Sequence, residues 1–367
     1  MKKLPVVLLL GKLPPPFMGP AIATQLLLNS SLRDHFRLVH LDTRAHQSLS
    51  DMGGWSLIKF IRTIAIYLRM KWLLFRHFPD VVVIPVSQST LGFFKDSLYI
   101  WIAKAFFRKV VLHLRGSNFR NWYENSGAVN KWYVRGVLKS VQGVIVQGDK
   151  LRSIFEGLVP AHRIHVVPNG ADYPIVPSSC DHQPIALLYL ANLQSSKGIQ
   201  DVLEAAALLA DKKYPFRLDV VGAWRNEETK RTCLDFVENH RLPVYFHAAA
   251  SGSDKYRFLE QADVFVFTPR DPEGHPWVIV EAQAAGLPIV ATDRGAIAEA
   301  VSDGVNGFIV DTNSPGQIAE KLIELIDNRE LRKRMGLAAR KTYEIRYTES
   351  AMVANMTTAL HAVIENK

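Results

Sequence analysis

The sequence predicts an α/β protein made of two doubly wound, Rossmann-like domains. Short apolar runs rich in Val, Ile and Leu alternate with helix-like segments through both halves of the chain, as expected for parallel sheets covered by helices. The length of 367 residues suits two domains, and a hydrophobic content of 48% is sufficient for two sizeable cores. We place the first domain at residues 1–172, a linker at 173–184 and the second domain at 185–345.

Strands of the first half are predicted where apolar runs are short and bounded by polar or turn-forming residues. They cover residues 6–10, 36–41, 80–86, 109–114, 143–146 and 164–167. Helices are predicted at 21–29 and 55–78 from apolar residues that recur at helical spacing. Three prolines and two serines within residues 173–184 indicate a linker.

The second half shows the same alternation. Strands are predicted at 185–190, 217–221, 244–247, 263–268 and 289–291. Helices are predicted at 199–210, 255–261, 276–285, 317–327, 330–346 and 353–364. Ligands of open parallel sheets bind at the carboxyl ends of the strands. Candidate site residues are therefore expected in the loops that follow the strands.

Residues 263–295 carry the most informative of these loops. A polar loop, 269–275, follows the strand, and a helix is expected to begin at Pro276, where a missing N–H costs nothing. Glu273 in the loop and Glu281 in the helix lie on either side of the free N–H groups of the first helical turn, which form an anion site. A carboxylate there could hold hydroxyls of a sugar or ribose. The alternative is a surface loop with a solvated glutamate, but the apolar neighbours of Glu281 favour a cleft or an interface.

Two glycines lie in other strand-end loops. Gly19 is in the first loop, residues 11–20, just ahead of a helix, where glycine lets the backbone approach a phosphate or a sugar. Gly222 directly follows the strand at 217–221, which is consistent with a loop on the ligand side.

A histidine lies near the end of the strand at 109–114. His113 is a candidate ligand for a sugar hydroxyl or a candidate proton shuttle, although a lone histidine is more often structural. Arg115 and Asn118 follow it and are candidates for contacts with an acceptor or a phosphate.

The net charge of +9 is concentrated in the first half. Residues 1–182 hold 23 Lys and Arg against 10 Asp and Glu, whereas residues 183–367 hold 21 against 25. This asymmetry predicts an anionic partner for the first domain, such as a membrane surface, a phosphorylated acceptor or nucleic acid, with a merely solvated basic surface as the alternative. Residues 55–78 hold five basic residues and no acid among apolar residues at helical spacing, and residues 91–108 continue this basic, aromatic character. The first segment suits either an interfacial helix on anionic lipid or a core helix with a basic face.

Several classes of protein are not expected. The two cysteines, Cys180 and Cys233, are far apart, and no cluster has metal-ligand spacing, so we predict no metal site and a reducing compartment. No nucleic-acid motif occurs, so no nucleic-acid partner is expected. The apolar run after Met1 resembles a signal peptide but is short and is followed by Lys12, which favours a first strand. The sequence has no run of about 18 uncharged apolar residues, so no membrane-spanning helix is expected.

The stretch from Glu273 onward resembles the signature of glycosyltransferase family 4, a family of the group 1 type. Residues 273–281, EGHPWVIVE, match its E-G-x-x-x-x-x-x-E block. Residues 282–292, AQAAGLPIVAT, match A-x-A-x-G-x-P-(I/V)-V-A-(T/S), and residues 295–310, GAIAEAVSDGVNGFIV, match the downstream pattern. This resemblance covers the second domain well and the first only loosely. It implies the GT-B fold, in which the two domains face each other across a cleft and a C-terminal helix, here 346–367, crosses back to the first domain.

The resemblance also implies the donor-side residues. The family pattern G-R-x-x-x-x-K-G grips the donor diphosphate, and this chain keeps Lys197 but has Asn192 in place of the arginine, with Arg270 as a candidate substitute. Glu273 is expected to hold hydroxyls of the donor sugar, and Glu281 the donor ribose. The other donor-side candidates are Gly19, Gly222, Gly274, His275, Pro276 and Trp277. His275 and Pro276 stand where family members often have an aromatic residue and glycine.

Many family members have a histidine at the strand end where this chain has His113. The expected catalytic residues are therefore His113 and Glu273, with Arg115 and Asn118 on the acceptor side. The implied reaction moves a sugar from a UDP- or GDP-sugar, with retention at the anomeric carbon and with no further cofactor. The expected acceptor is a glycan or a lipid-linked intermediate of cell-surface polysaccharide or lipopolysaccharide.

The protein is expected in the cytoplasm, with a peripheral position on the inner face of the plasma membrane as a further expectation. Two other functions stay open. One is a sugar-nucleotide-binding protein without transfer activity, and the other is a different GT-B enzyme such as a nucleotide-sugar epimerase. Release of nucleotide diphosphate in the presence of an acceptor would discriminate between binding and transfer.

Overall fold

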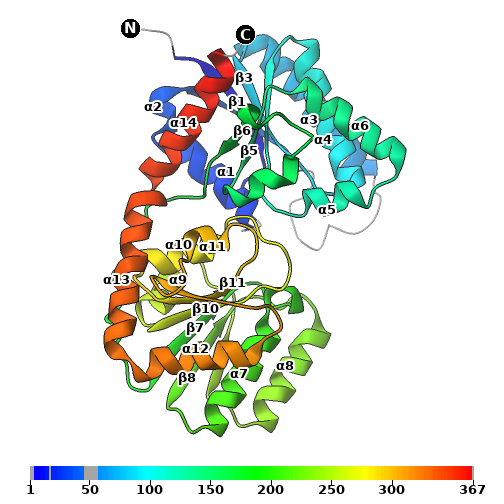
Figure 1. The fold of residues 1–367 in the computed structure, drawn as a ribbon. Helices are drawn as coiled ribbons and strands as arrows, with labels where there is room; N and C mark the ends of the chain where they lie inside the picture. The colour runs from blue at the N-terminus through cyan, green and yellow to red at the C-terminus, as the bar shows by residue number, and fades with distance from the viewer. Residues whose placement is uncertain (1–3, 16–17, 45–56, 366–367) are drawn as a thin grey trace. The chain divides into compact units, whose positions relative to one another are not determined.

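The computed structural model describes residues 4–15, 18–44 and 57–365. Within it the chain divides into two compact units (Figure 1). Unit 1 consists of Met1–Ala171 together with Glu349–Lys367, and unit 2 consists of Asp172–Thr348. The C-terminal segment therefore returns to the first unit, as the fold class predicted.

Unit 1 is built on a six-stranded parallel sheet with the order β2-β1-β3-β4-β5-β6. The strands are almost continuous runs of Val, Leu and Ile, which suits a parallel sheet buried on both faces. Their bounds are β1 Val6–Gly11, β2 Arg37–Asp42, β3 Val81–Pro85, β4 Lys109–His113, β5 Gly143–Val146 and β6 Ile164–Val166.

Helices cover both faces of this sheet (Figure 1). On one face lie α1 (Gly19–Asn29), α2 (Leu32–His35) and α14 (Glu349–Glu365), and alternate strand residues pack against them in one core. On the other face lie α3 (Leu57–His77), α4 (Thr90–Ala105) and α6 (Ala128–Ser140). The shorter helices are α5 (Phe119–Glu124) and the 3-10 turns η2 (Lys150–Phe155) and η3 (Ala161–Arg163).

Unit 2 repeats the plan with a parallel sheet of order β12-β11-β10-β7-β8-β9. Its strands are β7 Ile185–Leu190, β8 Phe216–Val221, β9 Val244–His247, β10 Val264–Phe267, β11 Ile289–Thr292 and β12 Gly307–Val310. Its helices are η4 Ser195–Lys197, α7 Ile199–Asp211, α8 Glu227–Asn239, α9 Gly252–Glu260, α10 Trp277–Ala284, α11 Ile297–Ala300, α12 Pro315–Asp327 and α13 Arg329–Arg346. Alternate residues of β7 enter two different cores, one on each face of the sheet.

The predicted fold class, two doubly wound parallel sheets covered by helices, is confirmed. Most predicted strands agree with the structure to within one or two residues. Several elements were not assigned from the sequence, and the longest of them are α4, α6 and α8; β12 is an unassigned strand. Pro276 was predicted to begin a helix, but it is the residue before the helix, and α10 begins at Trp277. Trp55, which opened the predicted helix at 55–78, lies outside the described residues.

Residues 173–184, predicted as a linker, pack on unit 2. The backbone N–H of Ser178 donates to the carbonyl of Ala285 at 2.9 Å, and the N–H of Tyr173 donates to the Tyr343 hydroxyl at 3.2 Å. The Cys180 side chain is buried against Gly286. None of the helices in the described part of the chain is long and apolar enough to cross a membrane.

Asp263 anchors the start of β10 to the start of β7. Its fully buried carboxylate accepts hydrogen bonds from the backbone N–H of Ala186 at 2.7 Å and from the N–H of His182 at 3.0 Å. The His182 ring nitrogen Nδ1 lies 2.9 Å from the same carboxylate. Because both backbone donors lie where the chain enters β7, this one carboxylate satisfies groups that the sheet ladder leaves without partners.

We expect Asp263→Ala to lower the free energy of unfolding by about 3 kcal/mol, because each buried donor that loses its acceptor costs about 1–3 kcal/mol. Urea unfolding of the two proteins measures the difference. Asp254→Ala is the matched control, since Asp254 is an exposed acid of unit 2 in a surface ion pair, and it should change stability little. A loss in Asp263→Ala no larger than in the control would contradict the anchoring role.

Candidate functional site

Two loops meet at the carboxyl edge of the sheet in unit 2. One follows β7 and ends at Lys197, and the other follows β10 and contains Glu273. Because β7 and β10 are neighbours in the sheet, their loops leave it side by side. The Lys197 ammonium forms an ion pair with the Glu273 carboxylate, and the two side chains are 23% and 14% exposed. The structure therefore brings together two residues that lie 76 positions apart in the sequence.

Glycines make this meeting possible. Gly198 has φ of +76°, and a Cβ at this position would overlap the carbonyl oxygen of Thr268 at the end of β10. Gly295, with φ of +62°, packs in the same way against the carbonyl oxygen of Glu273. The N–H of Ala296 also donates to the carbonyl of Gly274 at 3.0 Å. The loop after β11 therefore holds the backbone at Glu273 and Gly274, while Gly198 packs against the start of the same β10 loop.

Burial controls the protonation of Glu273. Burial raises the pKa of the Glu273 carboxyl, and the Lys197 ammonium opposes part of this shift. A carboxylate held in this way can accept hydrogen bonds from hydroxyl groups, and the lysine beside it can neutralise a phosphate. The arrangement suits a ligand that carries both kinds of group.

Glu281 lies inside α10 and is almost completely buried, with 3% exposure. One carboxylate oxygen, Oε1, pairs with the ammonium of Lys255 from α9. Among the described residues, none donates a hydrogen bond to the other oxygen, Oε2. Burial raises the pKa of the Glu281 carboxyl, and Lys255 opposes this shift. A buried acceptor without a protein donor is a candidate partner for a ligand hydroxyl.

His275 and Pro276 form the entry to α10. The His275 ring is buried and lies 4.7 Å from the Tyr347 ring, centroid to centroid. Burial, with a smaller effect of the Arg346 charge, lowers the pKa of His275 to about 3, so the imidazole is neutral at pH 7. Pro276 has extended backbone, and the half-buried Trp277 begins the helix. The first turn of α10 thus directs its free N–H groups toward the same loop.

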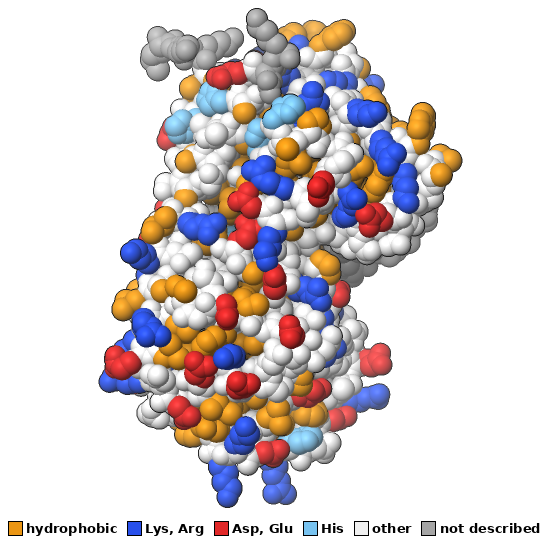
Figure 2. Space-filling model, in the orientation of Figure 1, with side chains coloured by type: hydrophobic (Ala, Val, Ile, Leu, Met, Phe, Trp, Pro, Cys, Tyr) orange, Lys and Arg blue, Asp and Glu red, His pale blue; other side chains and the backbone are white. Residues whose placement is uncertain are grey.

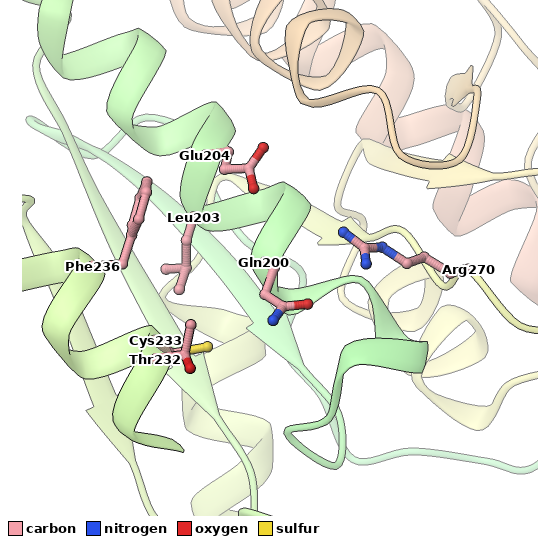
Figure 3. A pocket seen from close by; sticks show the side chains of 7 residues that line it. All are labelled: Gln200, Leu203, Glu204, Thr232, Cys233, Phe236 and Arg270. Atoms are coloured by element: carbon pink, nitrogen blue, oxygen red, sulfur yellow. The ribbon is translucent and has the colours of Figure 1, made fainter. Parts of the chain in front are cut away.

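Arg270 is held by an acid that the sequence analysis did not identify. Its guanidinium donates to both carboxylate oxygens of the buried Asp201, at 2.9 Å and 2.6 Å. Figure 3 shows the Arg270 side chain at the rim of a cavity between α7 and α8. The cavity measures about 300 Å³ and is lined by Gln200, Leu203, Glu204, Thr232, Cys233, Phe236 and Arg270. The predicted contact of Arg270 with a donor stays a prediction.

Asn192 and Gly222 lie in the loops after β7 and β8. Asn192 is exposed. A Cβ at Gly222 would overlap the carbonyl oxygen of Ala191, so Gly222 allows these two loops to approach each other. The structure therefore gives Gly222 a packing role at this edge of the sheet.

The predicted residues of unit 1 form a second set. His113 ends β4 and is buried, and among the described residues neither ring nitrogen has a hydrogen-bond partner. Burial, and secondarily the Arg115 charge, lowers the pKa of His113 well below its usual range. Arg115 donates from Nη1 to the Thr24 hydroxyl at 2.7 Å and to the carbonyl of Pro20, next to Gly19 at the start of α1.

Asn118 differs from its neighbours because it is exposed. It precedes α5, and its side-chain oxygen Oδ1 accepts a hydrogen bond from the Asn121 side-chain amide at 3.1 Å. Burial lowers the pKa of Arg115 to about 10, which is still high enough for a positive charge at pH 7. Unit 1 therefore places a neutral imidazole close in sequence to a cation and an exposed amide.

Lys255 and Asp201 are the charged partners that the sequence analysis missed. Each pairs with a predicted residue from another element, Lys255 with Glu281 and Asp201 with Arg270. No spacing rule links these pairs, because their members are 26 and 69 positions apart. No group of three or more His, Cys, Asp or Glu side chains in the described residues could hold a metal ion.

Part of unit 2 is similar to a known protein family. Residues 177–342, which lie inside unit 2, match the family model for glycosyl transferases group 1. These residues are similar to a group 1 glycosyl transferase domain. The resemblance predicted from the motifs is thereby confirmed at the level of group 1, whereas family 4 stays a prediction.

Curated relatives of this glycosyl transferase domain share part of the chain. The Staphylococcus aureus capsular polysaccharide biosynthesis glycosyltransferase CapM is 30% identical over 162 residues, which cover 44% of this chain and 41% of that protein. The Campylobacter jejuni N,N'-diacetylbacillosaminyl-diphospho-undecaprenol alpha-1,3-N-acetylgalactosaminyltransferase is 28% identical over 186 residues, which cover 51% and 46%. The match thus spans less than half the length of these relatives.

A solved structure is similar over nearly the whole chain. Anabaena Alr3699/HepE in complex with UDP has a TM-score of 0.74 and covers 98% of this chain and 100% of its own, at 16% sequence identity. At this identity the likeness establishes the fold, which is GT-B.

We expect Lys255→Met to destabilise the protein by about 3–5 kcal/mol, because it leaves the buried Glu281 carboxylate without its counter-charge. The double variant Lys255→Met/Glu281→Gln should recover most of this loss, since no charge then stays buried alone. Urea unfolding at pH 7 measures both effects. If the double variant were no more stable than Lys255→Met, the ion pair would not be the cause of the loss.

The pKa of His275 predicts a loss of stability in acid. The folded state keeps this pKa near 3, while the unfolded chain binds a proton below its ordinary value of 6.5. Stability should therefore fall as the pH falls from 7, and His275 should contribute about 2 kcal/mol of the loss by pH 5. In His275→Gln the difference in unfolding free energy between pH 7 and pH 5 should shrink by this amount. The exposed His240→Gln in the same unit is the control; an equal slope in wild type and His275→Gln would contradict the assignment.

Proposed function

We propose that this protein is a retaining glycosyltransferase that moves a sugar from a UDP- or GDP-sugar to a glycan or lipid-linked acceptor in the synthesis of cell-surface polysaccharide. The observation that carries the proposal is the arrangement of Lys197, Glu273 and the half-paired Glu281 at the carboxyl edge of one parallel sheet. Nucleotide ligands of open α/β sheets bind at this edge.

Lys197 is the proposed cation for the donor diphosphate. The departing nucleotide diphosphate gains negative charge as the bond to the sugar breaks, and a cation fixed beside it stabilises that charge. The Glu273 carboxylate holds the Lys197 ammonium in place before the donor binds. The free N–H groups at the start of α10 add further donors for the phosphates.

The two glutamates take the hydroxyl groups of the donor. Glu281 has one oxygen fixed by Lys255 and the other without a donor in the described chain, which suits a hydroxyl of the ribose. Glu273 lies in the loop ahead of the helix and suits hydroxyls of the sugar. Trp277 is the first residue of α10 and is half-buried. It lies between these two glutamates in the sequence.

Unit 1 is the proposed acceptor side. His113 is neutral because of its lowered pKa, so its ring can accept a hydrogen bond from, or donate one to, a sugar or acceptor hydroxyl. Arg115 and Asn118 follow it as a cation and an exposed amide for an anionic or sugar acceptor. The proposed reaction rests on positioning and charge stabilisation, and it requires no metal or other cofactor.

The functions of similar proteins support this proposal. CapM is a glycosyltransferase of capsular polysaccharide biosynthesis, and the Campylobacter jejuni relative acts on a diphospho-undecaprenol. Alr3699/HepE, which shares the fold, was solved with UDP and with UDP-glucose. By this reasoning the enzyme works in the cytoplasm, where nucleotide sugars are expected, and is peripheral on the inner face of the plasma membrane.

A second candidate is a protein that binds a sugar nucleotide without transferring the sugar. The exposed Asn192 stands where the resembling family has an arginine, and Arg270 is already paired with Asp201. Release of nucleotide diphosphate that depends on an acceptor supports transfer; saturable binding without such release supports the second candidate.

We expect Lys197→Ala to lower transfer by about 100-fold or more, because one charge-stabilising donor in an enzyme site contributes about that factor. The measurement is the release of nucleoside diphosphate from a donor that a thermal-shift screen of nucleotide sugars has identified. Lys212→Ala, an exposed lysine just after α7, is the matched control. Turnover at the wild-type rate in a folded Lys197→Ala protein would refute the role of Lys197.

Glu281→Gln should weaken donor binding, since an amide keeps the size of the side chain but replaces one acceptor oxygen with a donor. The stabilisation by the nucleotide sugar should fall while the protein without ligand stays folded. Equal stabilisation of Glu281→Gln and wild type over a full titration would contradict the role of Glu281 in binding the donor.

A further inference from the structure

Helix α3 of unit 1 has apolar side chains on two opposite faces. One face, with Met70, Leu73 and Leu74, is buried against the sheet. The other face is exposed, and its apolar residues are three or four positions apart, so they form one stripe along the helix. This stripe consists of Ile61, Ile64, Leu68, Trp72 and Phe75, which are between 42% and 67% exposed.

Basic residues border the exposed stripe. Arg62, Arg69 and Arg76 are each seven positions apart, so they form a row along one side of the stripe, and Lys71 lies on its other side. All four are exposed. An amphipathic helix that lies in a membrane interface has this distribution, with apolar residues in the middle and basic residues at the sides.

Helix α4 lies beside α3 and carries a second stripe. The Tyr67 hydroxyl of α3 donates to the carbonyl of Lys95 in α4 at 3.1 Å, and the Tyr67 ring packs on the Tyr99 ring with centroids 4.7 Å apart. The exposed apolar residues of α4 are again three or four positions apart. They are Leu91, Phe94, Leu98 and Trp101, and Phe107 just beyond the helix is 93% exposed.

Helix α6 completes the same side of unit 1. It adjoins α4 through Tyr133, whose ring stacks on Phe94 and whose hydroxyl accepts from the Trp101 indole at 3.2 Å. It adds the exposed Val129 and Trp132. The part of this side that is visible in Figure 2, around α6, has Lys or Arg side chains and apolar side chains next to each other. We refer to the exposed side chains of these three helices as the α3–α4–α6 face.

The α3–α4–α6 face carries no exposed acid in the described residues. The only acidic residue of the three helices is Asp96, which is buried and accepts a hydrogen bond from the N–H of Ser87 at 2.8 Å. The other charged residues whose side chains are described are all Lys or Arg, namely Arg62, Arg69, Lys71, Arg76, Lys95, Lys104, Lys131, Arg135 and Lys139. A partner of this face must therefore offer apolar contact and negative charge together.

We propose that the α3–α4–α6 face docks on an anionic lipid bilayer, with its apolar stripes in the interface and its basic rows on the lipid phosphates. Large exposed apolar patches on soluble proteins mark interaction sites, and this one has the charge of an anionic membrane partner. A second copy of the chain fits less well, because a symmetric contact through the stripes would bring basic side chains of both copies together with no exposed acid of the face to pair with them. The inference deepens the proposed function, on which it rests for the expectation of a membrane-borne acceptor.

Co-sedimentation with vesicles tests the proposal. The probes are vesicles of phosphatidylcholine alone and vesicles with about a third phosphatidylglycerol. Wild-type protein should sediment with the second kind and much less with the first. The triple variant Arg62→Gln/Arg69→Gln/Arg76→Gln should lose on the order of 100-fold in binding, since each basic side chain near an anionic surface contributes about a fivefold factor.

Leu68→Ser/Trp72→Ser/Phe75→Ser tests the apolar part, and it too should sediment poorly with the anionic vesicles. These side chains are exposed, so their loss should leave the folded state intact. The matched controls change exposed residues of unit 2: Lys212→Gln/Arg225→Gln/Arg231→Gln for charge and Val305→Ser/Leu337→Ser/Ile345→Ser for the apolar residues. Both controls should bind vesicles as the wild type does.

Three results would overturn the proposal: no sedimentation of the wild type with either vesicle, equal binding by the variants and the wild type, or equal losses in the controls. A wild-type dimer that the apolar variant converts to a monomer, without vesicle binding, would assign the face to a second copy. Stabilisation by a nucleotide sugar, measured on the same proteins, separates the two proposals. Vesicle binding without any such stabilisation would support the docking of the α3–α4–α6 face on the membrane and refute the proposed function.

Discussion

The candidate site of unit 2 depends on the close approach of the loops that follow β7, β10 and β11. These strands are neighbours in one parallel sheet, so their loops leave the same edge together. Gly198 and Gly295 both have positive φ, and a Cβ at either would overlap a carbonyl oxygen of the β10 strand end or its loop. Only glycine tolerates this conformation and this contact at once. The approach of the backbones brings Lys197 to Glu273, and the rest of the site is arranged around that pair.

Burial then shifts the pKa values of the two carboxyl groups of the site. Burial raises the pKa of both Glu273 and Glu281, and one lysine opposes the shift in each case. A buried ion pair costs desolvation, which is compensated only when the remaining hydrogen-bonding capacity is used. Oε2 of Glu281 is still without a donor among the described residues. A ligand hydroxyl could donate a hydrogen bond to this oxygen, which is already buried in the folded protein. For this reason we propose that the ribose binds at Glu281.

The sequence predicted the sheets well because a buried parallel strand is a continuous apolar run, as in β1 and β7. The apolar neighbours of Glu281 predicted a cleft or an interface rather than a solvated position, and the side chain is buried. Helix α8 was not assigned because only Thr229 and Cys233 are buried in it, which is too few for a clear period. The partners of the site charges were missed for a different reason. Periodicity identifies which side of α9 faces inward, but it does not determine that Lys255 meets a glutamate of α10.

The sequence of helix α3 allowed two interpretations, a core helix or an interfacial one, because the helix has apolar residues on two opposite faces. A helix with apolar residues on opposite faces has a clear helical period, yet the period does not indicate which face is inside. The structure separates them: Leu73 and Leu74 are buried, and Leu68 and Trp72 are exposed. The core interpretation is thus confirmed for the buried face, and the interfacial interpretation stays a prediction for the exposed one. Arginines at the border between the faces can direct their guanidinium groups outward beside the exposed stripe while their stems lie along the helix. The basic residues that give the first half of the sequence its positive charge thus lie beside an exposed apolar stripe, for which we proposed an anionic membrane as the partner.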